Sequence, residues 1–200
     1  MLIPSRLILA SASPRRRELI SLLGLPYEVL PSRYEEPTSH DREIRIADFV
    51  QFLALEKARE VATRCGGGWV IGADTEVSLE EIGNPLGKPT DDADAFRMLR
   101  TLSGRTHRVT TGVAIIPVSE AGVMSEPMTF AEVTEVTFRS LTDTMIRRYV
   151  ETGDPLDKAG AYGAQDSAAL FIEQYDGDFF NVVGLPVCAL AKRLEESIKW

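Results

Sequence analysis

Apolar runs typical of strands alternate with helix-like apolar spacing along most of this chain. The predicted strands are Leu7–Ala10, Tyr27–Leu30, Trp69–Ile71, Arg108–Ile116, Thr129–Phe138 and Leu170–Glu173. The predicted helices are Pro14–Leu23, Ile44–Arg64, Asp92–Leu102, the stretch capped by Thr142 or Asp143 that reaches Glu151, and Pro186–Lys199. Alternation of the two patterns indicates an α/β fold.

Glycine and proline mark the connections between these elements. The long second helix is expected to stop at Cys65–Gly68, and a loop at Gly83–Pro89 leads to the next helix. The two long β segments, joined by a polar connection, predict an antiparallel pair. Residues 153–163 contain too many helix and strand breakers for regular structure.

Composition narrows the class of protein. The 200 residues are 44% hydrophobic, which suits one large domain over residues 1–200, or two closely packed lobes. A net charge of −8 argues against a nucleic-acid surface. Neither a membrane-spanning run nor a signal peptide is evident, so we expect a cytoplasmic protein. The two cysteines are far apart, and the two histidines have no metal-ligand spacing.

Three arginines after Pro14 give the first helix an unusual start. Ser13 is a good N-cap and Pro14 suits the first helical position, which leaves Arg15, Arg16 and Arg17 in the first turn. That turn is already electropositive, so arginines are unfavourable there unless an anion binds. With the hydroxyls of Ser11 and Ser13, this pattern favours a phosphate site over a solvated basic turn.

Asp74 follows the buried run Trp69–Ile71, at the expected end of a strand where α/β sheets bind ligands. Spacing alone supports equally a turn carboxylate that bonds nearby amides. Thr75 adds a hydroxyl, and Glu35 and Glu36 lie in an acidic loop. Together with Asp74, one of these two glutamates could hold Mg²⁺ or Mn²⁺ through oxygen ligands.

Lys57 lies in the middle of an otherwise apolar helix face. Its ammonium group either snorkels to water or meets a phosphate in a cleft. Lys88, between Gly87 and Pro89, is a second candidate cation. Gln165 offers both a donor and an acceptor to a base edge. The common nucleotide-binding glycine motifs and the serine-hydrolase motif are missing from the sequence.

Six motifs in this order resemble the Maf family of nucleoside triphosphate pyrophosphatases. They are Ala10–Arg16, Gly72–Thr75, Gly87–Pro89, Leu102–His107, Asp157–Gln165 and Asn181–Pro186. The resemblance spans nearly the whole chain. It implies a two-lobed, mixed-sheet α/β fold with a central cleft, similar to inosine triphosphate pyrophosphatases (the Maf/Ham1 architecture), and a homodimer.

The resemblance also implies hydrolysis between the α and β phosphates, with a divalent metal, to a nucleoside monophosphate and pyrophosphate. By position, the catalytic aspartate is Asp74 and the acidic metal ligand is Glu36. The basic residues for phosphate are Arg15, Arg16, Lys57 and Lys88. Asp74 either orients or deprotonates the water or holds the metal, and the sequence does not separate these roles.

The motif Ala159–Gln165 resembles the branch of the family that acts on dTTP and UTP. A sister branch acting on 7-methyl-GTP tends to carry Glu in place of Gln165. One amide can accept from N3–H of thymine or uracil and donate to O4. Asp166-Ser167 departs from the family pattern and adds a carboxylate that we expect beside the base pocket.

Two alternatives come from different classes. One is a 7-methyl-GTP pyrophosphatase, and the other is a nucleotide-binding regulator of cell division without turnover. A pure sensor has no need of a carboxylate near the scissile bond. Pyrophosphate release from a nucleotide panel separates these functions.

Overall fold

A six-stranded mixed sheet forms the centre of the computed structural model, which describes residues 6–37, 44–80 and 85–197. The strands lie in the order β2-β1-β3-β4-β5-β6. β2, β1 and β3 are parallel neighbours, whereas β3 to β6 pair antiparallel. Their bounds are β1 Leu7–Leu9, β2 Tyr27–Val29, β3 Gly68–Ser78, β4 Thr106–Val118, β5 Met128–Phe138 and β6 Ile172–Asp176. The mixed α/β sheet and its antiparallel pair β4–β5 confirm the prediction.

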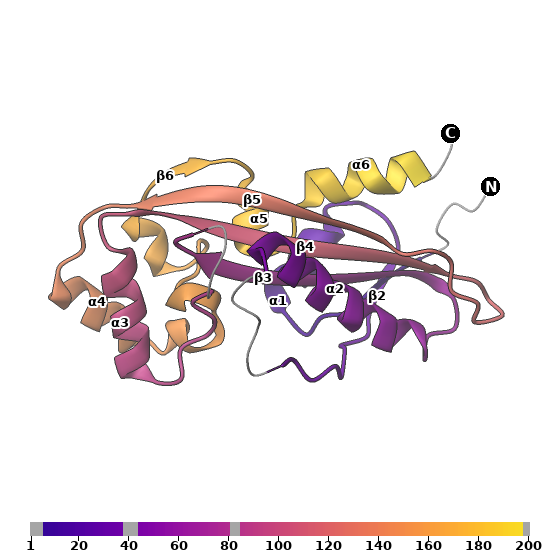
Figure 1. The fold of residues 1–200 in the computed structure, drawn as a ribbon, viewed down its shortest axis with the longest axis horizontal. Helices are drawn as coiled ribbons and strands as arrows, with labels where there is room; N and C mark the ends of the chain where they lie inside the picture. Colours follow the sequence, from indigo (N-terminus) through magenta and orange to yellow (C-terminus); the bar gives the residue numbers. More distant parts are fainter. Residues whose placement is uncertain (1–5, 38–43, 81–84, 198–200) are drawn as a thin grey trace.

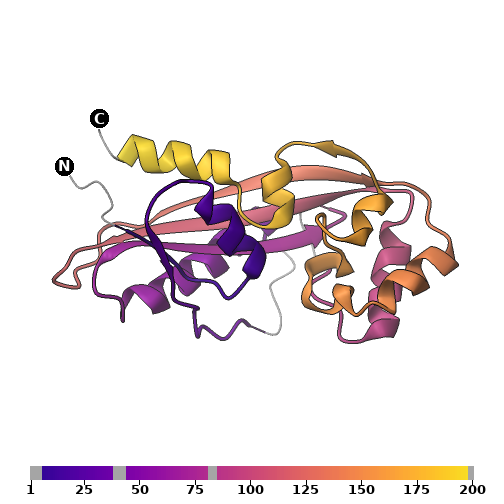
Figure 2. The same cartoon turned by 180° about the vertical axis from the view of Figure 1, so that it is seen from behind.

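Helices cover both faces of this sheet. Figure 1 shows α2 in front of the long strands, and Figure 2 shows α1, α5 and α6 on the opposite face. Successive residues of β1 point to opposite faces of the sheet. Ile8 packs with α2 on one face, whereas Leu7 and Leu9 pack with α1 and α6 on the other. The helix bounds are α1 Pro14–Ser21, α2 Ile46–Ala62, α3 Asp92–Leu102, α4 Asp143–Val150, α5 Phe179–Val183 and α6 Val187–Ser197.

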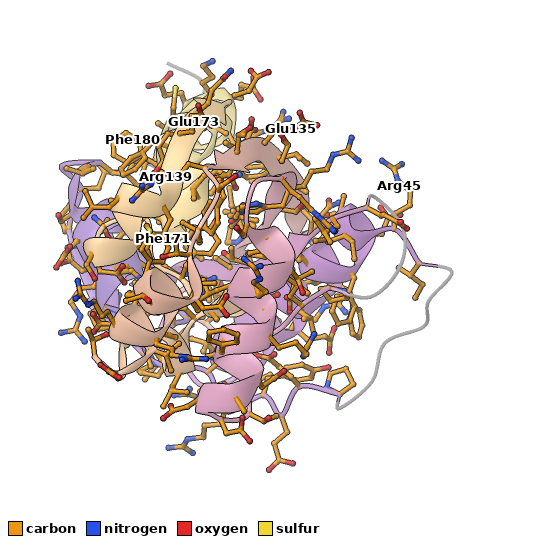
Figure 3. All side chains as sticks on the ribbon, turned by 90° about the vertical axis from the view of Figure 1, so that its left-hand side faces the viewer. Arg45, Glu135, Arg139, Phe171, Glu173 and Phe180 are labelled. Atoms are coloured by element: carbon orange, nitrogen blue, oxygen red, sulfur yellow. The ribbon has the colours of Figure 1, made fainter. Side chains whose placement is uncertain are left out.

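A third cluster fills the end of the molecule where α3 and α4 lie. Its centre is Phe138, whose ring packs edge to face against Tyr162 and Phe171. Figure 3 looks onto this end and labels Phe171. Three 3₁₀ helices surround the cluster: η1 Asp154–Asp157, η2 Ala159–Ala161 and η3 Ser167–Phe171. The sequence predicts no regular structure for residues 153–163; the structure agrees in having no α-helix or strand there, but it adds the two short 3₁₀ helices η1 and η2.

Two glycines let α2 lie directly on the sheet. A Cβ atom on Gly72 would stand 2.1 Å from the carbonyl oxygen of Ala54, and one on Gly112 would stand 2.3 Å from the carbonyl carbon of Val50. Larger residues at either position would push the helix away. This close contact holds Lys57, less than one turn beyond Ala54, next to the middle of β3.

The structure corrects three sequence predictions. β3 does not end at Ile71, because it pairs with β4 without interruption as far as Ser78. The last strand begins at Ile172 rather than at Leu170, because Asp166 caps a 3₁₀ helix over those residues. The short helix α5 was not predicted, although Asp178 caps it with a hydrogen bond from the amide of Phe180.

The remaining predictions agree within a few residues at helix and strand ends. Gly83 of the predicted loop and the predicted end of the last helix at Lys199 lie outside the described residues. Cys65 and Cys188 are both free. Within the described ranges, none of the helices is both long and apolar enough to cross a membrane.

Candidate active site

A cavity of about 380 Å³ lies between the start of α1, the middle of β3 and the segment that follows α4. Every predicted site residue lines it except Ser11. Those residues are Ser13, Arg15, Arg16, Glu36, Lys57, Asp74, Thr75, Lys88 and Gln165. The structure therefore brings together side chains that are up to 152 positions apart (165 − 13). Their chemical roles remain predictions.

The arginine turn has the predicted helix start. Ser13 Oγ accepts a hydrogen bond of 3.4 Å from the amide of Arg16, and Pro14 occupies the first helical position. Arg15 lines the cavity, and its guanidinium stands 3.8 Å from the carboxylate of Asp157 on the opposite wall. Arg17 is exposed and does not line the cavity. Of the three arginines, two face the site.

Arg16 differs from its neighbour because protein acceptors hold its guanidinium. It donates to the carbonyls of Gly184 at 2.8 Å and Ala73 at 2.9 Å, and to Thr75 Oγ1 at 3.0 Å. A longer bond of 3.5 Å reaches Ser11 Oγ, which places Ser11 behind the cavity wall. Burial lowers the pKa of Arg16, against the attraction of a nearby carboxylate. Arg16 therefore joins α1, β3 and the end of α5 at the cavity.

Lys57 lies between two carboxylates. Its ammonium nitrogen is 2.5 Å from Asp74 Oδ1 and 2.6 Å from Glu36 Oε1. The side chains of Lys57 and Asp74 are only 13% and 9% exposed, so the ammonium group points into the cavity and does not snorkel to water. Burial alone would raise the pKa of Glu36, but the hydrogen bond and charge of Lys57, with Lys88 and Arg16, lower it overall.

Asp74 lies in the interior of β3, opposite Gly112 of β4, and not at a strand end as predicted. The turn interpretation was therefore wrong, and so was the strand-end argument for a ligand site. The close packing of α2 on the sheet explains instead why Asp74 lies at the cavity. Gly72 and Gly112 leave room for this helix, and Lys57 on the helix contacts Asp74. Its Oδ2 is buried and accepts no hydrogen bond from the described residues.

Glu76 is a cavity carboxylate that the sequence reasoning missed. It follows Asp74 by two positions, so both side chains leave β3 on the same face, and this spacing was the available signal. Burial, together with the charges of Asp74 and Glu36, raises the pKa of Glu76 to about 8. Like Asp74 Oδ2, the buried Glu76 Oε2 has no hydrogen-bond partner among the described residues.

Two more lysines, Lys88 and Lys158, line the cavity and add positive charge to it. Lys88 is exposed, and its loop is tied to the opposite segment by a 2.8 Å bond from the amide of Gly160 to the carbonyl of Gly87. Lys158 was not predicted as a site residue. Its side chain is 10% exposed, and its ammonium group contacts the carbonyl of Asp154 and, at 2.7 Å, the carboxylate of Asp157.

Gln165 lines the other end of the cavity with Tyr162. The hydroxyl of Tyr162 shares a 2.8 Å hydrogen bond with His107 Nε2 in the core. Asp166 does not add a carboxylate to this pocket, contrary to the expectation from the sequence. Its side chain turns away, caps η3, and accepts a hydrogen bond from the hydroxyl of Tyr149.

The oxygen ligands suit a hard cation only in part. Asp74 Oδ2 and Glu76 Oε2 are free acceptors in the cavity, which is the chemistry that Mg²⁺ or Mn²⁺ prefers. Within the described ranges, however, no three His, Cys, Asp or Glu side chains form a group that could hold a metal ion by itself. Because Mg²⁺ usually combines one or two carboxylates with substrate phosphates, the residues fit a cation that arrives with a polyphosphate.

Comparison with known proteins gives one consistent result. A family model described as Maf-like protein matches residues 6–197. The dTTP/UTP pyrophosphatase of Moorella thermoacetica is 52% identical over 190 residues, covering 95% of this chain and 94% of that protein. That of Alkaliphilus oremlandii is 48% identical, with 92% of each chain covered, and that of Bacillus pumilus is 47% identical, with 96% of each covered.

Solved structures also align with the chain. One of them is the nucleoside-triphosphatase / dITP/XTP pyrophosphatase from Mycobacterium abscessus, at 16% identity and a TM-score of 0.39, over 66% of this chain and 72% of that one. A likeness at this TM-score carries no argument about the chain.

Proposed function

The chain belongs to the Maf family, and on that premise we propose that it hydrolyses nucleoside triphosphates, preferably dTTP and UTP, to the monophosphate and pyrophosphate. The observation that carries this proposal is the group formed by Lys57, Asp74 and Glu36. A buried carboxylate with one unpaired oxygen faces a cavity that several cations line. That arrangement suits attack of water on a polyphosphate.

The cations would bind the phosphates and offset the charge that develops as pyrophosphate leaves. Arg15 and Lys88 are the residues whose charged groups are least engaged by the protein, so they would contact phosphate oxygens directly. Arg16 would act mainly by holding the wall of the cavity, since three of its hydrogen bonds are 3.0 Å or shorter.

Asp74 would handle the attacking water. Its Oδ1 is fixed by Lys57, and its Oδ2 remains as an acceptor that can orient the water or take its proton. A bound divalent cation would supply charge neutralisation and a lower pKa for the water. Asp74 and Glu36, with Glu76 as a further carboxylate, would be its protein ligands.

Selection of the base falls to Gln165. Its amide oxygen can accept from N3–H of thymine or uracil while its amide nitrogen donates to O4. The relatives from Moorella thermoacetica and Alkaliphilus oremlandii are dTTP/UTP pyrophosphatases, which supports this branch over 7-methyl-GTP. The alternative of a regulator without turnover would use the same pocket, but it gives no role to the unpaired oxygen of Asp74.

The test is a product assay. The protein is incubated with Mg²⁺ and, in turn, dTTP, UTP, CTP and 7-methyl-GTP, and the products are separated by chromatography. We expect dTMP or UMP with pyrophosphate, and loss of products after chelation of the metal. Fastest turnover of 7-methyl-GTP would contradict the base assignment, and binding without any product would favour the regulator.

Three further expectations remain predictions. Size measurement by sedimentation tests the homodimer, and fractionation of cells tests the cytoplasmic location. A single cooperative unfolding transition in calorimetry would support one domain of two closely packed lobes over residues 1–200.

A further inference from the structure

We infer that Tyr149 and Asp166 are positioning residues for base selection, because together they fix the turn that carries Gln165. This inference rests on the proposed function, in which Gln165 contacts the base. It also assigns a purpose to Asp166, the residue at which the sequence departs from the family pattern. Neither side chain lines the cavity, so both would act through the backbone of the turn.

The turn spans Gly163 to Asp166. The amide of Asp166 donates to the carbonyl of Gly163 at 3.4 Å, which closes a four-residue turn. Ala164 and Gln165 occupy its two central positions. Gln165 is exposed and lines the cavity, so its side chain depends on the backbone of this turn for its position.

One hydroxyl holds both ends of the turn. Tyr149, on α4, accepts a 3.3 Å hydrogen bond from the amide of Gly163 and donates to both carboxylate oxygens of Asp166 at 3.1 Å. The ring of Tyr149 packs edge to face against Phe171, with centroids 5.3 Å apart, so the hydroxyl itself has little freedom. Burial raises the pKa of Tyr149, which keeps the proton that it donates.

Asp166 ties the turn to two more groups. Its Oδ1 accepts a 2.8 Å bond from the amide of Ala168, and its Oδ2 stands 3.7 Å from the ammonium nitrogen of Lys158. The start of the turn packs closely against this carboxylate, because a Cβ on Gly163 would lie 2.3 Å from Asp166 Oδ2. The turn therefore cannot shift without breaking hydrogen bonds or meeting side-chain atoms.

A fixed backbone matters here because an amide can flip. With its oxygen and nitrogen exchanged, Gln165 would suit the edge of cytosine as well as that of uracil. That exchange is a rotation within the side chain, so the backbone does not prevent it, but a backbone held in one place keeps the amide where its neighbours can favour one orientation. Loosening the turn should therefore weaken discrimination between dTTP and CTP more than it weakens the reaction itself.

The experiment uses Tyr149→Phe, Asp166→Ala and the double variant, with kcat and KM measured for dTTP and CTP. Tyr149→Phe removes only the hydroxyl and keeps the ring against Phe171. Asp166→Asn is the conservative variant, since its side-chain oxygen can still accept from Tyr149. The matched control is Tyr27→Phe on β2, a phenol outside the cavity lining. Inorganic tripolyphosphate has no base, so its inhibition of the enzyme measures binding by the phosphate-binding residues alone.

We expect the dTTP-to-CTP ratio of kcat/KM to fall about five-fold in each single variant, a change the size of one hydrogen bond to the base. KM for dTTP should carry the change, with kcat and tripolyphosphate inhibition close to wild type. The double variant should add little, because both changes release the same turn. Asp166→Asn and Tyr27→Phe should keep the wild-type ratio.

The control for the premise is Gln165→Ala. If this variant loses the preference for dTTP while Tyr149→Phe and Asp166→Ala keep it, the positioning role is refuted and the proposed function stands. If Gln165→Ala leaves the preference unchanged, Gln165 does not read the base and the assignment of the pocket fails. Equal losses against dTTP, CTP and tripolyphosphate would show a general structural role, which also overturns the inference.

Discussion

The two ends of the cavity are built in opposite ways. At the phosphate end, formed by Arg15, Lys57, Asp74 and Glu76, buried oxygens of Asp74 and Glu76 accept no hydrogen bond from the described residues. At the base end, Tyr149 and Asp166 share several bonds, and the hydroxyl of Tyr162 is paired with His107. At the phosphate end the unpaired atoms are carboxylate oxygens of cavity-lining residues, whereas at the base end most polar groups bond to one another and His107 Nδ1 is the exception.

This difference follows from what each end would recognise. A polyphosphate and its cation bring charge, so the protein can leave oxygens and cations available for them. A base brings a flat edge with fixed donors and acceptors, and its recognition depends on groups held in place. We therefore expect substitutions at the phosphate end to change chemistry and charge balance, and substitutions at the base end to change selection.

The largest expected effect comes from Asp74→Asn. Loss of the carboxylate that handles water should lower kcat by about 10³-fold, within the range for a general base. The amide is nearly the same size, so circular dichroism and the melting temperature should show a folded protein. Asp92→Asn, an exposed change on α3, is the matched control. If folded Asp74→Asn keeps a near-normal kcat, Asp74 does not act on the water, and the phosphate end has no special role in the chemistry.

The next effect separates two adjacent arginines. Arg15→Ala should raise KM for dTTP about 10- to 100-fold, the value of a charged hydrogen bond, with little change in stability. Arg16→Ala should also lower the free energy of unfolding by about 2 kcal/mol or more, because the bonds to Ala73 and Gly184 are lost.

Arg17→Ala is the control for both arginine variants, since this side chain is exposed. Chemical denaturation measures stability and steady-state kinetics measures KM. Equal stability of the Arg15 and Arg16 variants would contradict the structural role of Arg16.

At the base end, acid should be destabilising. Burial lowers the pKa of His107 to about 4, below its usual 6.5, so the folded state binds its proton less tightly than the unfolded chain. Stability from neutral His107 is present above pH 6.5 and is lost as pH falls toward 4. The loss at pH 5 should be about 2 kcal/mol. Chemical denaturation of wild type and His107→Gln across this pH range measures the loss of stability. If the stability of both proteins falls in parallel, His107 is not the cause of the loss.

At the phosphate end, the sign of the pH dependence is reversed. The pKa of Glu76 is raised to about 8, so the folded state holds this proton more tightly than the unfolded chain. Stability therefore falls as pH rises from about 4.5 to 8. Without metal at pH 8.5, Glu76→Gln should melt about 10 °C above wild type, because a pKa of about 8 against 4.5 in the unfolded chain corresponds to roughly 4–5 kcal/mol at that pH. At pH 4 the two proteins should have the same melting temperature. A lower melting temperature for the variant at pH 8.5 would show that the charged carboxylate has a stabilising partner.

Local chemistry explains what could be predicted from the sequence. The Ser13 cap and the proline after it act within one helical turn, so they were identified correctly. Contacts between residues distant in the chain could not be predicted in this way. Arg16 bonds to Gly184, 168 positions away. The pairing of β3 with β4 places Asp74 in the interior of a strand. Glu76 was missed because its spacing from Asp74 matters only when that strand continues. Asp166 was read as a pocket group because nothing in the sequence places Tyr149 beside it.

The bond network of Arg16 has a consequence for the timing of synthesis. The guanidinium belongs to the first helix, yet one of its acceptors is the carbonyl of Gly184, close to the other end of the chain. A ribosome must release nearly the whole polypeptide before that bond can form. The nascent chain can build its early helices and strands, but it cannot complete the cavity wall until the last segment emerges. Chains truncated before this point would carry Asp74 without the finished cavity wall around it.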